Sequence, residues 1–274
     1  MRIGVVAPSS RIEPGFETSI HDLAARLFPS NAPEIVFHPQ CYLAHGHFAG
    51  DDAARAAAFL DYANDPAFDA LWFVRGGYGA GRLAEAVLDG VTHRARDKMY
   101  MGYSDAGSLL GALYQARFPY IAHGPMPRDI TRHGGEAAVT RALKFLVEGD
   151  PASLEASVGE PPSVAFNMAV FSALVGTPFQ PDLTDQVLML EEINEYMYRV
   201  DRFLFHITSN EQVRGAAGLR LGRVSQTPPN DPDFAMTEEE VAQLWCARSG
   251  IPYLGRADIG HDADNKVVPF GRWK

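Results

Sequence analysis

The sequence predicts an α/β protein with a parallel sheet that is covered by helices on both faces. First, short apolar runs alternate with helical patterns over the first 150 residues, which is the order of elements in a parallel sheet. Second, the first run, residues 2–7, is compact, apolar and broken by Pro8, as expected of a buried strand. Third, 46% of the 274 residues are hydrophobic and 21% are charged, so the chain can bury a full core in one large domain or two modest ones.

The elements of the predicted sheet follow from this alternation. Strands are predicted at residues 2–7, 34–37, 70–74, 99–101 and 119–122. Helices are predicted at residues 16–28, 51–63, 82–88, 107–116 and 135–147. Pro29 ends the first helix, and Asp51 is placed to cap the second. Ligands of parallel sheets bind beyond the carboxyl ends of the strands, where the glycine-rich residues 75–82 and Ser104 both fall.

Residues 148–163 (EGDPASLEASVGEPPS) separate two parts of the chain. They are rich in proline, glycine, serine and acidic residues and show little periodicity, which is typical of a linker. We therefore predict an N-terminal domain at residues 1–150, a linker at 151–163 and a C-terminal domain at 164–274. In the second domain, helices are predicted at residues 167–174, 199–206 and 237–248, and strands at 186–190 and 218–222.

The composition disfavours several classes of partner. The net charge of −10 argues against binding to nucleic acid or to an anionic membrane. No run approaches the ~20 apolar residues of a membrane-spanning helix, and the run before Pro8 is too short for a secretory signal. Cys41 and Cys246 lack the spacing of a zinc site or a disulfide framework. We expect a soluble, cytoplasmic protein with no metal and no cofactor.

Residues 98–116 (KMYMGYSDAGSLLGALYQA) have the order strand, sharp turn, helix. A serine at such a corner exposes its hydroxyl, and the N–H groups at the helix start face whatever the hydroxyl attacks. Ala106 replaces the last glycine of the familiar G-x-S-x-G elbow. These residues leave two interpretations equally open: Ser104 is a nucleophile, or it caps the following helix with Asp105 in the first turn.

A serine nucleophile needs a base, and the base needs a third group to orient it. Glu191 follows the apolar run QVLML, so we expect it at the exit of a strand. Alternatively Glu191 and Glu192 form a solvated pair, which the spacing slightly favours. His261 lies in a loop after Gly260, where the backbone can approach a neighbour closely. Eight other histidines compete for the role.

The other histidines and the glycine run have less specific interpretations. His45 and His47 could be half of a metal site, but without a second cluster a plain loop is favoured. His123 could line the cleft, although a structural histidine is the better interpretation. Residues 75–82 (RGGYGAGR) match neither a dinucleotide fingerprint nor a phosphate loop. They could supply N–H groups to an oxyanion or form an ordinary flexible connection, with equal weight.

Seven stretches in order along the chain resemble the LD-carboxypeptidase family, the S66 serine peptidases. They are APSS at residues 7–10, RGGYGAGRL at 75–83, MGYSDAGSLL at 101–110, HGPM at 123–126, the segment from Asn167 to VGTPF, LEEINEYMYRVDRFL at 190–204, and DIGH before VPFG. The combination of RGGYG, GYSD and the acidic Y-x-x-DR block is specific. The resemblance implies an N-terminal flavodoxin-like domain, a smaller C-terminal β/α/β domain and a site in the cleft between them.

The same resemblance assigns roles to individual residues. It implies Ser104 as the nucleophile, His261 as the general base and Glu191 as the residue that orients the base. It also implies an oxyanion hole made by the backbone N–H groups of Asp105 and of Gly76 or Gly77. The chain departs from the family pattern at Glu191-Glu192 and Asn194, where an acidic-Asp pair and a following glycine are usual. It also ends at Lys274, soon after VPFG, so we expect the walls that grip the substrate to differ more than the triad.

The implied activity is hydrolysis of the bond between an L-centre and the terminal D-alanine of a murein tetrapeptide, in peptidoglycan recycling. A free terminal carboxylate needs a cation, and the matching segments hold four arginines: Arg75, Arg82, Arg199 and Arg202. The predicted substrate contacts are Arg75, Tyr78 and Arg199. The expected partners are a small peptide substrate and, in a homodimer, a second copy of the chain; no nucleic acid and no membrane are expected.

Two other functions fit the sequence. A sister branch resembles the microcin-immunity peptidases, which use the same triad on aminoacyl or peptidyl nucleotides. Such an enzyme needs an aromatic surface for the base, for which Trp72, Trp245 and Trp273 are available. The third candidate is a relative that binds a ligand in the cleft without chemistry.

Overall fold

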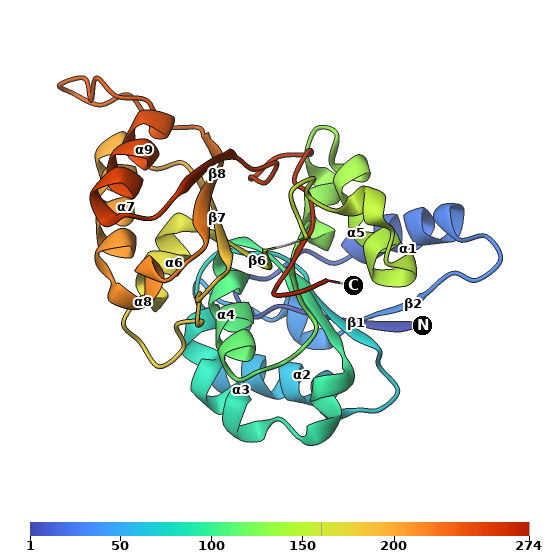
Figure 1. Ribbon diagram of the computed structural model, residues 1–274. Helices are drawn as coiled ribbons and strands as arrows, with labels where there is room; N and C mark the ends of the chain where they lie inside the picture. Colours follow the sequence, from blue (N-terminus) through green and yellow to red (C-terminus); the bar gives the residue numbers. More distant parts are fainter. Residues whose placement is uncertain (160, 274) are drawn as a thin grey trace.

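The computed structural model describes residues 1–159 and 161–273, and its elements form two sheets that lie side by side (Figure 1). Glu160, in the predicted linker, and Lys274, at the end of the predicted second domain, lie outside the described residues. Within the described ranges, no helix combines the length and the apolar character needed to cross a bilayer.

The first sheet has six strands in the order β10-β5-β4-β3-β1-β2. Their bounds are β1 Arg2–Val6, β2 Glu34–Phe37, β3 Ala70–Phe73, β4 Met99–Gly102, β5 Ile121–His123 and β10 Val268–Pro269. All pairs are parallel except β10 with β5. The order 2-1-3-4-5 is that of flavodoxin-like sheets, so the predicted N-terminal fold is confirmed.

Helices cover both faces of this sheet (Figure 1). They are α1 Phe16–Leu27 and α5 Gly135–Glu148 on one face, and α2 Asp52–Asn64, α3 Ala84–Gly90 and α4 Gly107–Gln115 on the other. Neighbouring residues of β3 point to opposite faces: Trp72 packs with the core of α1 and α5, and Phe73 with that of α2 to α4. Both are fully buried, which explains why this strand reads as a continuous apolar run.

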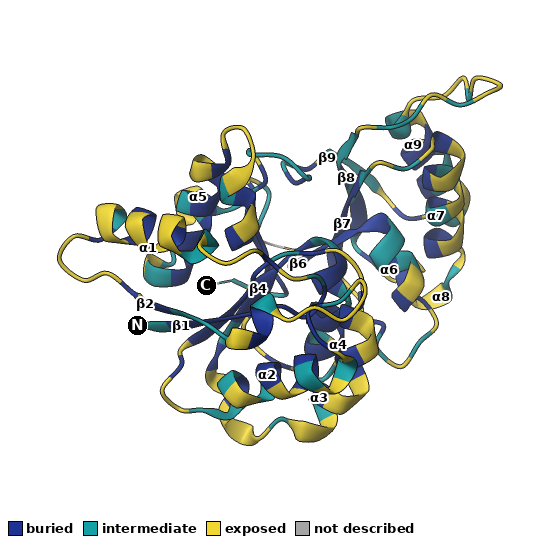
Figure 2. Ribbon diagram, turned by 180° about the vertical axis from the view of Figure 1, so that it is seen from behind, coloured by how far each residue is buried: buried dark blue, intermediate teal, exposed yellow. Residues whose placement is uncertain are grey.

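The second sheet has four parallel strands in the order β6-β7-β8-β9. Their bounds are β6 Ser163–Asn167, β7 Val187–Ile193, β8 Gly218–Ser225 and β9 Tyr253–Arg256. The helices of this part are α6 Met168–Leu174, α7 Met197–Ser209, α8 Glu211–Arg214 and α9 Glu238–Ser249. Each turns a buried face inward and an exposed face outward (Figure 2). This arrangement confirms a second, smaller β/α/β unit.

Two predicted elements were wrong in detail, and the pairing of the last segment was not predicted. Residues 163–167 form strand β6 where the linker was predicted to end and a helix to begin at residue 167. Strand β7 runs on to Ile193, so Glu191 and Glu192 lie inside the strand rather than at its exit. The last segment leaves the second sheet, because β10 pairs with β5 of the first sheet. The predicted domain boundaries at residues 150 and 164 stay a prediction.

Candidate active site

Ser104 lies at the sharp corner between β4 and α4. Its backbone has a φ of 60°, in the left-handed region that non-glycine residues rarely adopt. A short 3-10 helix, residues 104–106, follows at once and leads into α4. Neither this turn nor α4 has a side-chain cap hydrogen bond. The interpretation of Ser104 as a helix cap is therefore wrong, and its hydroxyl is available for another partner.

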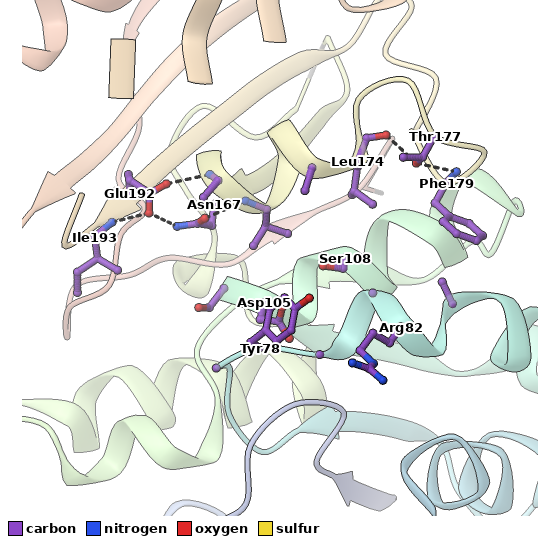
Figure 3. Close-up of a pocket in the computed structure, with 18 of the residues that line it drawn as sticks. Tyr78, Arg82, Asp105, Ser108, Asn167, Leu174, Thr177, Phe179, Glu192 and Ile193 are labelled. Carbon is purple, nitrogen blue, oxygen red and sulfur yellow. Dashed lines mark hydrogen bonds between the residues drawn. The ribbon is translucent and has the colours of Figure 1, made fainter. Parts of the chain in front are cut away.

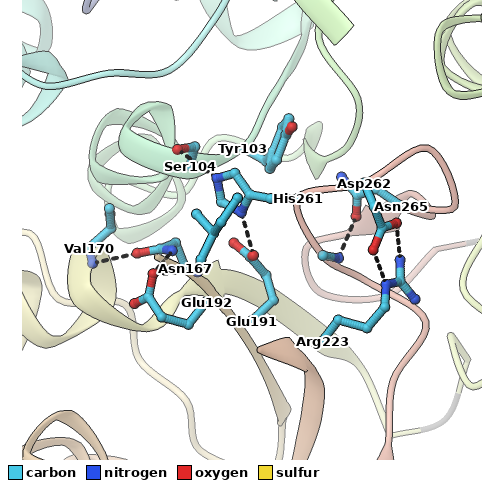
Figure 4. A network of polar contacts seen from close by, with 12 residues as sticks. Tyr103, Ser104, Asn167, Val170, Glu191, Glu192, Arg223, His261, Asp262 and Asn265 are labelled. Atoms are coloured by element: carbon cyan, nitrogen blue, oxygen red, sulfur yellow. Dashed lines mark hydrogen bonds and ion pairs between the residues drawn. The ribbon is translucent and has the colours of Figure 1, made fainter. Parts of the chain in front are cut away.

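That partner is His261, which links Ser104 to Glu191 (Figure 4). His261 Nε2 lies 3.0 Å from Ser104 Oγ, and His261 Nδ1 lies 2.6 Å from Glu191 Oε2. The side chains of His261 and Glu191 are 6% and 0% exposed. The three groups thus form one hydrogen-bonded chain that begins at a partly exposed alcohol and ends at a buried carboxylate.

The carboxylate determines how the imidazole can act. Nδ1–H donates to Glu191, which leaves Nε2 free to accept the Ser104 hydroxyl hydrogen. Burial lowers the pKa of His261, but the charge and hydrogen bond of Glu191 outweigh burial, so the pKa of His261 is raised above its usual value. Glu191 Oε1 is buried without a hydrogen-bond partner in the described part of the chain. The site therefore strengthens the imidazole as a base and stabilises its protonated form.

Glu191 and Glu192 are adjacent but have separate partners. The pairing of β7 with β8 shifts register between Leu190 and Glu192, an irregularity that is common beside active sites. Glu192 accepts hydrogen bonds from Asn167 Nδ2 at 2.6 Å and from the N–H of Ala169 at 2.8 Å. Burial raises its pKa to about 7. The alternative of a solvated pair is wrong, because both carboxyl groups are buried.

The glycine-rich loop lies directly against Ser104. A Cβ on Gly76 would be 2.8 Å from Ser104 Oγ and 3.5 Å from the backbone nitrogen of Asp105, so only glycine fits here. The Asp105 carboxylate accepts hydrogen bonds from Ser9 Oγ and from the N–H of Ala80, the latter at 2.8 Å. Asp105 thus holds the C-terminal end of the loop at Ala80, while Gly76, near its N-terminal end, lies against the Ser104 hydroxyl.

The loop that carries His261 is fixed by two arginines. Arg223 of β8 forms ion pairs with Asp258 and Asp262, on either side of the histidine (Figure 4). Arg141 of α5 donates to the carbonyl oxygens of Ala263 and Asn265, at 3.1 and 2.7 Å. One arginine comes from each of the two sheet layers, so both parts of the molecule position the imidazole.

His123 supports the same loop from beneath. Its Nε2 lies 3.2 Å from Asn265 Oδ1, which also accepts the N–H of Gly260. Burial lowers the pKa of His123 to about 4, so this histidine is neutral. It is a structural histidine, which was the favoured interpretation, and it supports the His261 loop through Asn265 and packs 5.5 Å from the ring of Tyr103.

Tyr103 packs against the imidazole and joins it to a buried acid. The rings of Tyr103 and His261 lie 4.8 Å apart, and the Tyr103 hydroxyl donates to Asp129 at 2.8 Å. Asp129 also pairs with Arg132 at 3.1 Å, and Arg132 donates to the carbonyl oxygen of His261. Sequence reasoning missed this group: Tyr103 lies in the matching stretch at residues 101–110 but was assigned no role, and Asp129 and Arg132 lie in a short turn outside the matching stretches.

Two cavities meet at Ser104. The larger, of about 700 Å³, is lined by residues of the glycine loop and of α6, together with Asn167, Glu192 and Arg199 (Figure 3). The smaller, of about 250 Å³, is lined by Arg75, Arg128, Arg132 and His261 among others. Ser104, Gly77 and Ile193 belong to both linings. The Ser104 hydroxyl can therefore be reached from two cavities, which differ in volume and in the charge of the residues that line them.

The predicted substrate residues all lie on these walls. Arg75 lines the smaller cavity, whereas Tyr78 and Arg199 line the larger one. Arg199 also pairs with Glu195 at 2.7 Å. Of the two remaining arginines, Arg82 lines the larger cavity, and the Arg202 guanidinium lies over the ring of Tyr198.

The three tryptophans have structural surroundings. Trp72 is fully buried in the first sheet, Trp245 donates to Asp201 at 2.8 Å, and Trp273 packs on Phe145. In residues 1–159 and 161–273, no group of three or more His, Cys, Asp or Glu side chains is arranged to hold a metal ion.

The chain matches known proteins along most of its length. Family models for the LD-carboxypeptidase N-terminal domain and the LD-carboxypeptidase C-terminal domain match residues 3–124 and 162–273. A probable murein peptide carboxypeptidase of Bacillus subtilis (strain 168) is 27% identical over 285 residues, which cover 98% of this chain and 86% of that protein.

Two solved structures share the fold. The muramoyltetrapeptide carboxypeptidase from Oxalobacter formigenes superposes with a TM-score of 0.76 at 24% identity, over 98% of this chain and 93% of that one. The microcin C7 self-immunity protein MccF, in complex with aspartyl sulfamoyl adenosine, superposes with a TM-score of 0.78 at 16% identity, over 98% and 91%.

Proposed function

Because the chain belongs to the LD-carboxypeptidase (S66) family of serine carboxypeptidases, we propose that it releases the terminal D-alanine of murein tetrapeptides with Ser104, His261 and Glu191 as its catalytic triad. One observation carries the proposal: the hydrogen-bonded chain from Ser104 Oγ through His261 to Glu191. A nucleophile, a base and an orienting acid in this order are the parts that acyl transfer to serine requires.

The reaction follows from the geometry. Ser104 Oγ attacks the carbonyl carbon of the scissile bond while His261 Nε2 takes the hydroxyl proton. His261 then gives this proton to the nitrogen of the leaving amino acid, and the C–N bond breaks to leave an ester on Ser104. A water molecule attacks the ester, His261 again accepts and returns a proton, and the acid product leaves. Glu191 keeps Nδ1 protonated and stabilises the imidazolium in each half of the reaction.

The negative oxygen of each tetrahedral intermediate needs hydrogen-bond donors. Asp105 lies in the first turn of a short helix, where N–H groups have no partner within the helix, and Gly76 lies against the Ser104 hydroxyl. We assign the oxyanion hole to the N–H groups of Asp105 and of Gly76 or Gly77. The absence of a side chain at Gly76 leaves room for the substrate oxygen.

A specific observation also favours a second substrate class. Tyr78 is 59% exposed on the wall of the larger cavity, and its ring lies 6.1 Å from Phe48 and 6.2 Å from His47. An exposed ring of this kind can stack on a nucleobase, in an enzyme that resembles MccF. The alternative is therefore hydrolysis of aminoacyl or peptidyl nucleotides, with Tyr78 in the role that the tryptophans do not fill. A relative that only binds ligand is less favoured, because a strained serine beside a base has no use in simple binding.

A comparison of substrates tests the proposal. Purified protein is incubated with a murein tetrapeptide and with an aminoacyl sulfamoyl adenosine, and released D-alanine and released amino acid are measured. Faster D-alanine release supports the carboxypeptidase, and faster nucleotide cleavage supports the alternative. Failure of a fluorophosphonate probe to label Ser104 would favour the ligand-binding relative. A cytoplasmic location and a homodimer stay predictions.

A further inference from the structure

We propose that the smaller cavity beside His261 is the subsite of the leaving amino acid and that Arg75 and Arg128 together hold its carboxylate. This inference rests on the proposed function. It names the residues that would recognise the free terminal carboxylate, which is the feature that distinguishes a carboxypeptidase substrate. Arg128 follows the HGPM stretch and was not predicted from the sequence, whereas Arg75 was predicted as a substrate contact without a stated ligand group.

The position of His261 decides which side receives the leaving group. The imidazole must deliver a proton to the leaving nitrogen, so this nitrogen has to lie on the histidine side of Ser104. His261 lines the smaller cavity, and the lining of the larger cavity is formed instead by the glycine loop, α6 and the end of β7. The leaving residue therefore occupies the smaller cavity, and the acyl part of the peptide occupies the larger one.

The size of the smaller cavity limits what can leave. Its volume of about 250 Å³ is below the ~300–1,000 Å³ of pockets that hold drug-sized ligands. One small amino acid fits such a space. The cavity is therefore suited to release of a single terminal residue, which always carries a free carboxylate.

The arginines of this cavity differ in whether their charge is already balanced. Arg132 pairs with Asp129, whose carboxylate is also engaged by Tyr103 and by the N–H of Met126. Arg75 donates only to two carbonyl oxygens, those of Gly76 and Arg11, both at 3.3 Å. The Arg128 guanidinium has no hydrogen bond or ion pair with the described residues.

Arg75 and Arg128 are thus two cations of one small cavity that have no acidic partner among the described residues, since the one carboxylate in the lining of this cavity, that of Asp129, pairs with Arg132. Burial, and then the positive charge of Arg128, lowers the pKa of Arg75. A carboxylate placed between the two guanidinium groups would remove this repulsion and accept charge-assisted hydrogen bonds from both. The terminal carboxylate of a peptide whose scissile carbonyl lies at Ser104 is the anion that the reaction brings to this place.

The test compares a tetrapeptide that has a free terminal carboxylate with the same peptide as a terminal amide. The variants are Arg128→Gln, which changes an exposed side chain, and Arg75→Gln. The matched control is Arg94→Gln, an exposed arginine that precedes β4, at the opposite end of this strand from Ser104, and lines neither cavity. We expect wild type and the control to prefer the carboxylate. Each cavity variant should lose about 10- to 100-fold in kcat/KM on the carboxylate, mainly through KM, and change little on the amide. Inhibition by free D-alanine should weaken in parallel.

Labelling of Ser104 by a fluorophosphonate, which has no carboxylate, separates this inference from the proposed function. Unchanged labelling together with a lost carboxylate preference supports the anchor. If both variants keep the wild-type preference for carboxylate over amide and the wild-type inhibition by D-alanine, the anchor is wrong while the triad stands. If wild type labels but releases neither D-alanine from the acid nor D-alanine amide from the amide, the proposed function fails, and the subsite fails with it.

Discussion

Glu191 Oε2 lies 2.6 Å from His261 Nδ1, and both side chains are almost completely shielded from solvent. A buried carboxylate favours the protonated imidazole over the neutral one. This contact therefore does two things at once: it fixes which ring nitrogen faces Ser104, and it raises the pKa of His261.

Replacing Glu191 with Gln should slow the enzyme and move its pH profile. The base must be neutral to accept a proton, so activity falls as the pH drops through the pKa of His261. In wild type this pKa is raised above the usual 6.5, and loss of the Glu191 charge should lower it. We expect kcat to fall about 10²- to 10⁴-fold and the acid limb of kcat/KM to shift to lower pH. The measurement is a pH–rate profile of D-alanine release.

Glu191→Asp provides the control for this change, because it keeps the charge but shortens the side chain. It should lose activity while its acid limb stays closer to that of wild type. An acid limb that does not move in the Gln variant would mean that Glu191 does not set the pKa of the base.

Two substitutions of Ser104 separate its chemistry from its backbone strain. Both Ser104→Ala and Ser104→Gly remove the nucleophile, so D-alanine release should drop by about 10⁴-fold or more in each. The φ of 60° disfavours any residue with a Cβ and suits glycine. The Gly variant should therefore be more stable than the Ala variant by about 1 kcal/mol.

Urea unfolding of the two Ser104 variants and wild type provides the measurement of stability. Wild type and Ser104→Ala should unfold at similar denaturant concentrations, because both carry the same backbone strain. If the Ala variant still released D-alanine at the wild-type rate, Ser104 would not be the nucleophile. If glycine gave no gain in stability, the corner would not be strained.

A methyl group at Gly76 should block the site without unfolding the protein. Its Cβ would be 2.8 Å from both Cβ and Oγ of Ser104, closer than van der Waals contact allows. We expect Gly76→Ala to reduce kcat/KM at least about 100-fold, as for loss of an oxyanion donor, and to lower stability by about 1–3 kcal/mol through overpacking. The matched control is Gly159→Ala, since a Cβ there meets nothing within 4 Å; equal activity of both variants would contradict the close approach.

Most of the first sheet could be predicted because its strands are buried on both faces. A continuous apolar run such as residues 70–73 predicts a strand that is buried on both faces, and this prediction needs no information from the rest of the chain. Strand β6 was missed because its residues follow a proline-rich segment and end in Asn167, whose amide caps α6. The polar end resembles a helix start, and only pairing with β7 makes the segment a strand.

Glu191 and Glu192 of β7 show why the end of a strand is hard to predict from neighbouring residues alone. An apolar run normally ends where charges begin, yet Glu191 and Glu192 continue the strand because each finds a buried partner, His261 and Asn167. His261 is 70 residues away from Glu191 along the chain, so no window of sequence contains the pair. The resemblance to a family supplied this pairing, and it could not supply Arg128, which lies outside the matching stretches.

The buried carboxyl group of Glu192 should make the stability of the protein depend on pH. Burial raises its pKa from 4.5 to about 7, so between these values the folded state holds a proton that the unfolded state has lost. The contribution of Glu192 to stability is therefore greatest below pH 4.5 and falls as the pH rises to about 7. A shift of this size corresponds to about 3 kcal/mol.

Glu192→Gln removes this titration, and urea unfolding at several pH values measures the effect. Groups that do not interact with Glu192 titrate in both proteins and cancel in the difference, whereas the charge of Glu192 also helps to raise the pKa of His261, and this smaller effect stays in the difference. The free energy of unfolding of wild type minus that of the variant should decrease by about 3 kcal/mol from pH 4.5 to 7 and then stay constant. Glu85→Gln, a change at an exposed residue of α3, should leave the slope of wild type unaltered. A difference between wild type and Glu192→Gln that is flat across this range would mean that Glu192 is ionised in the folded protein, held by its hydrogen bonds to Asn167 and Ala169 despite its burial.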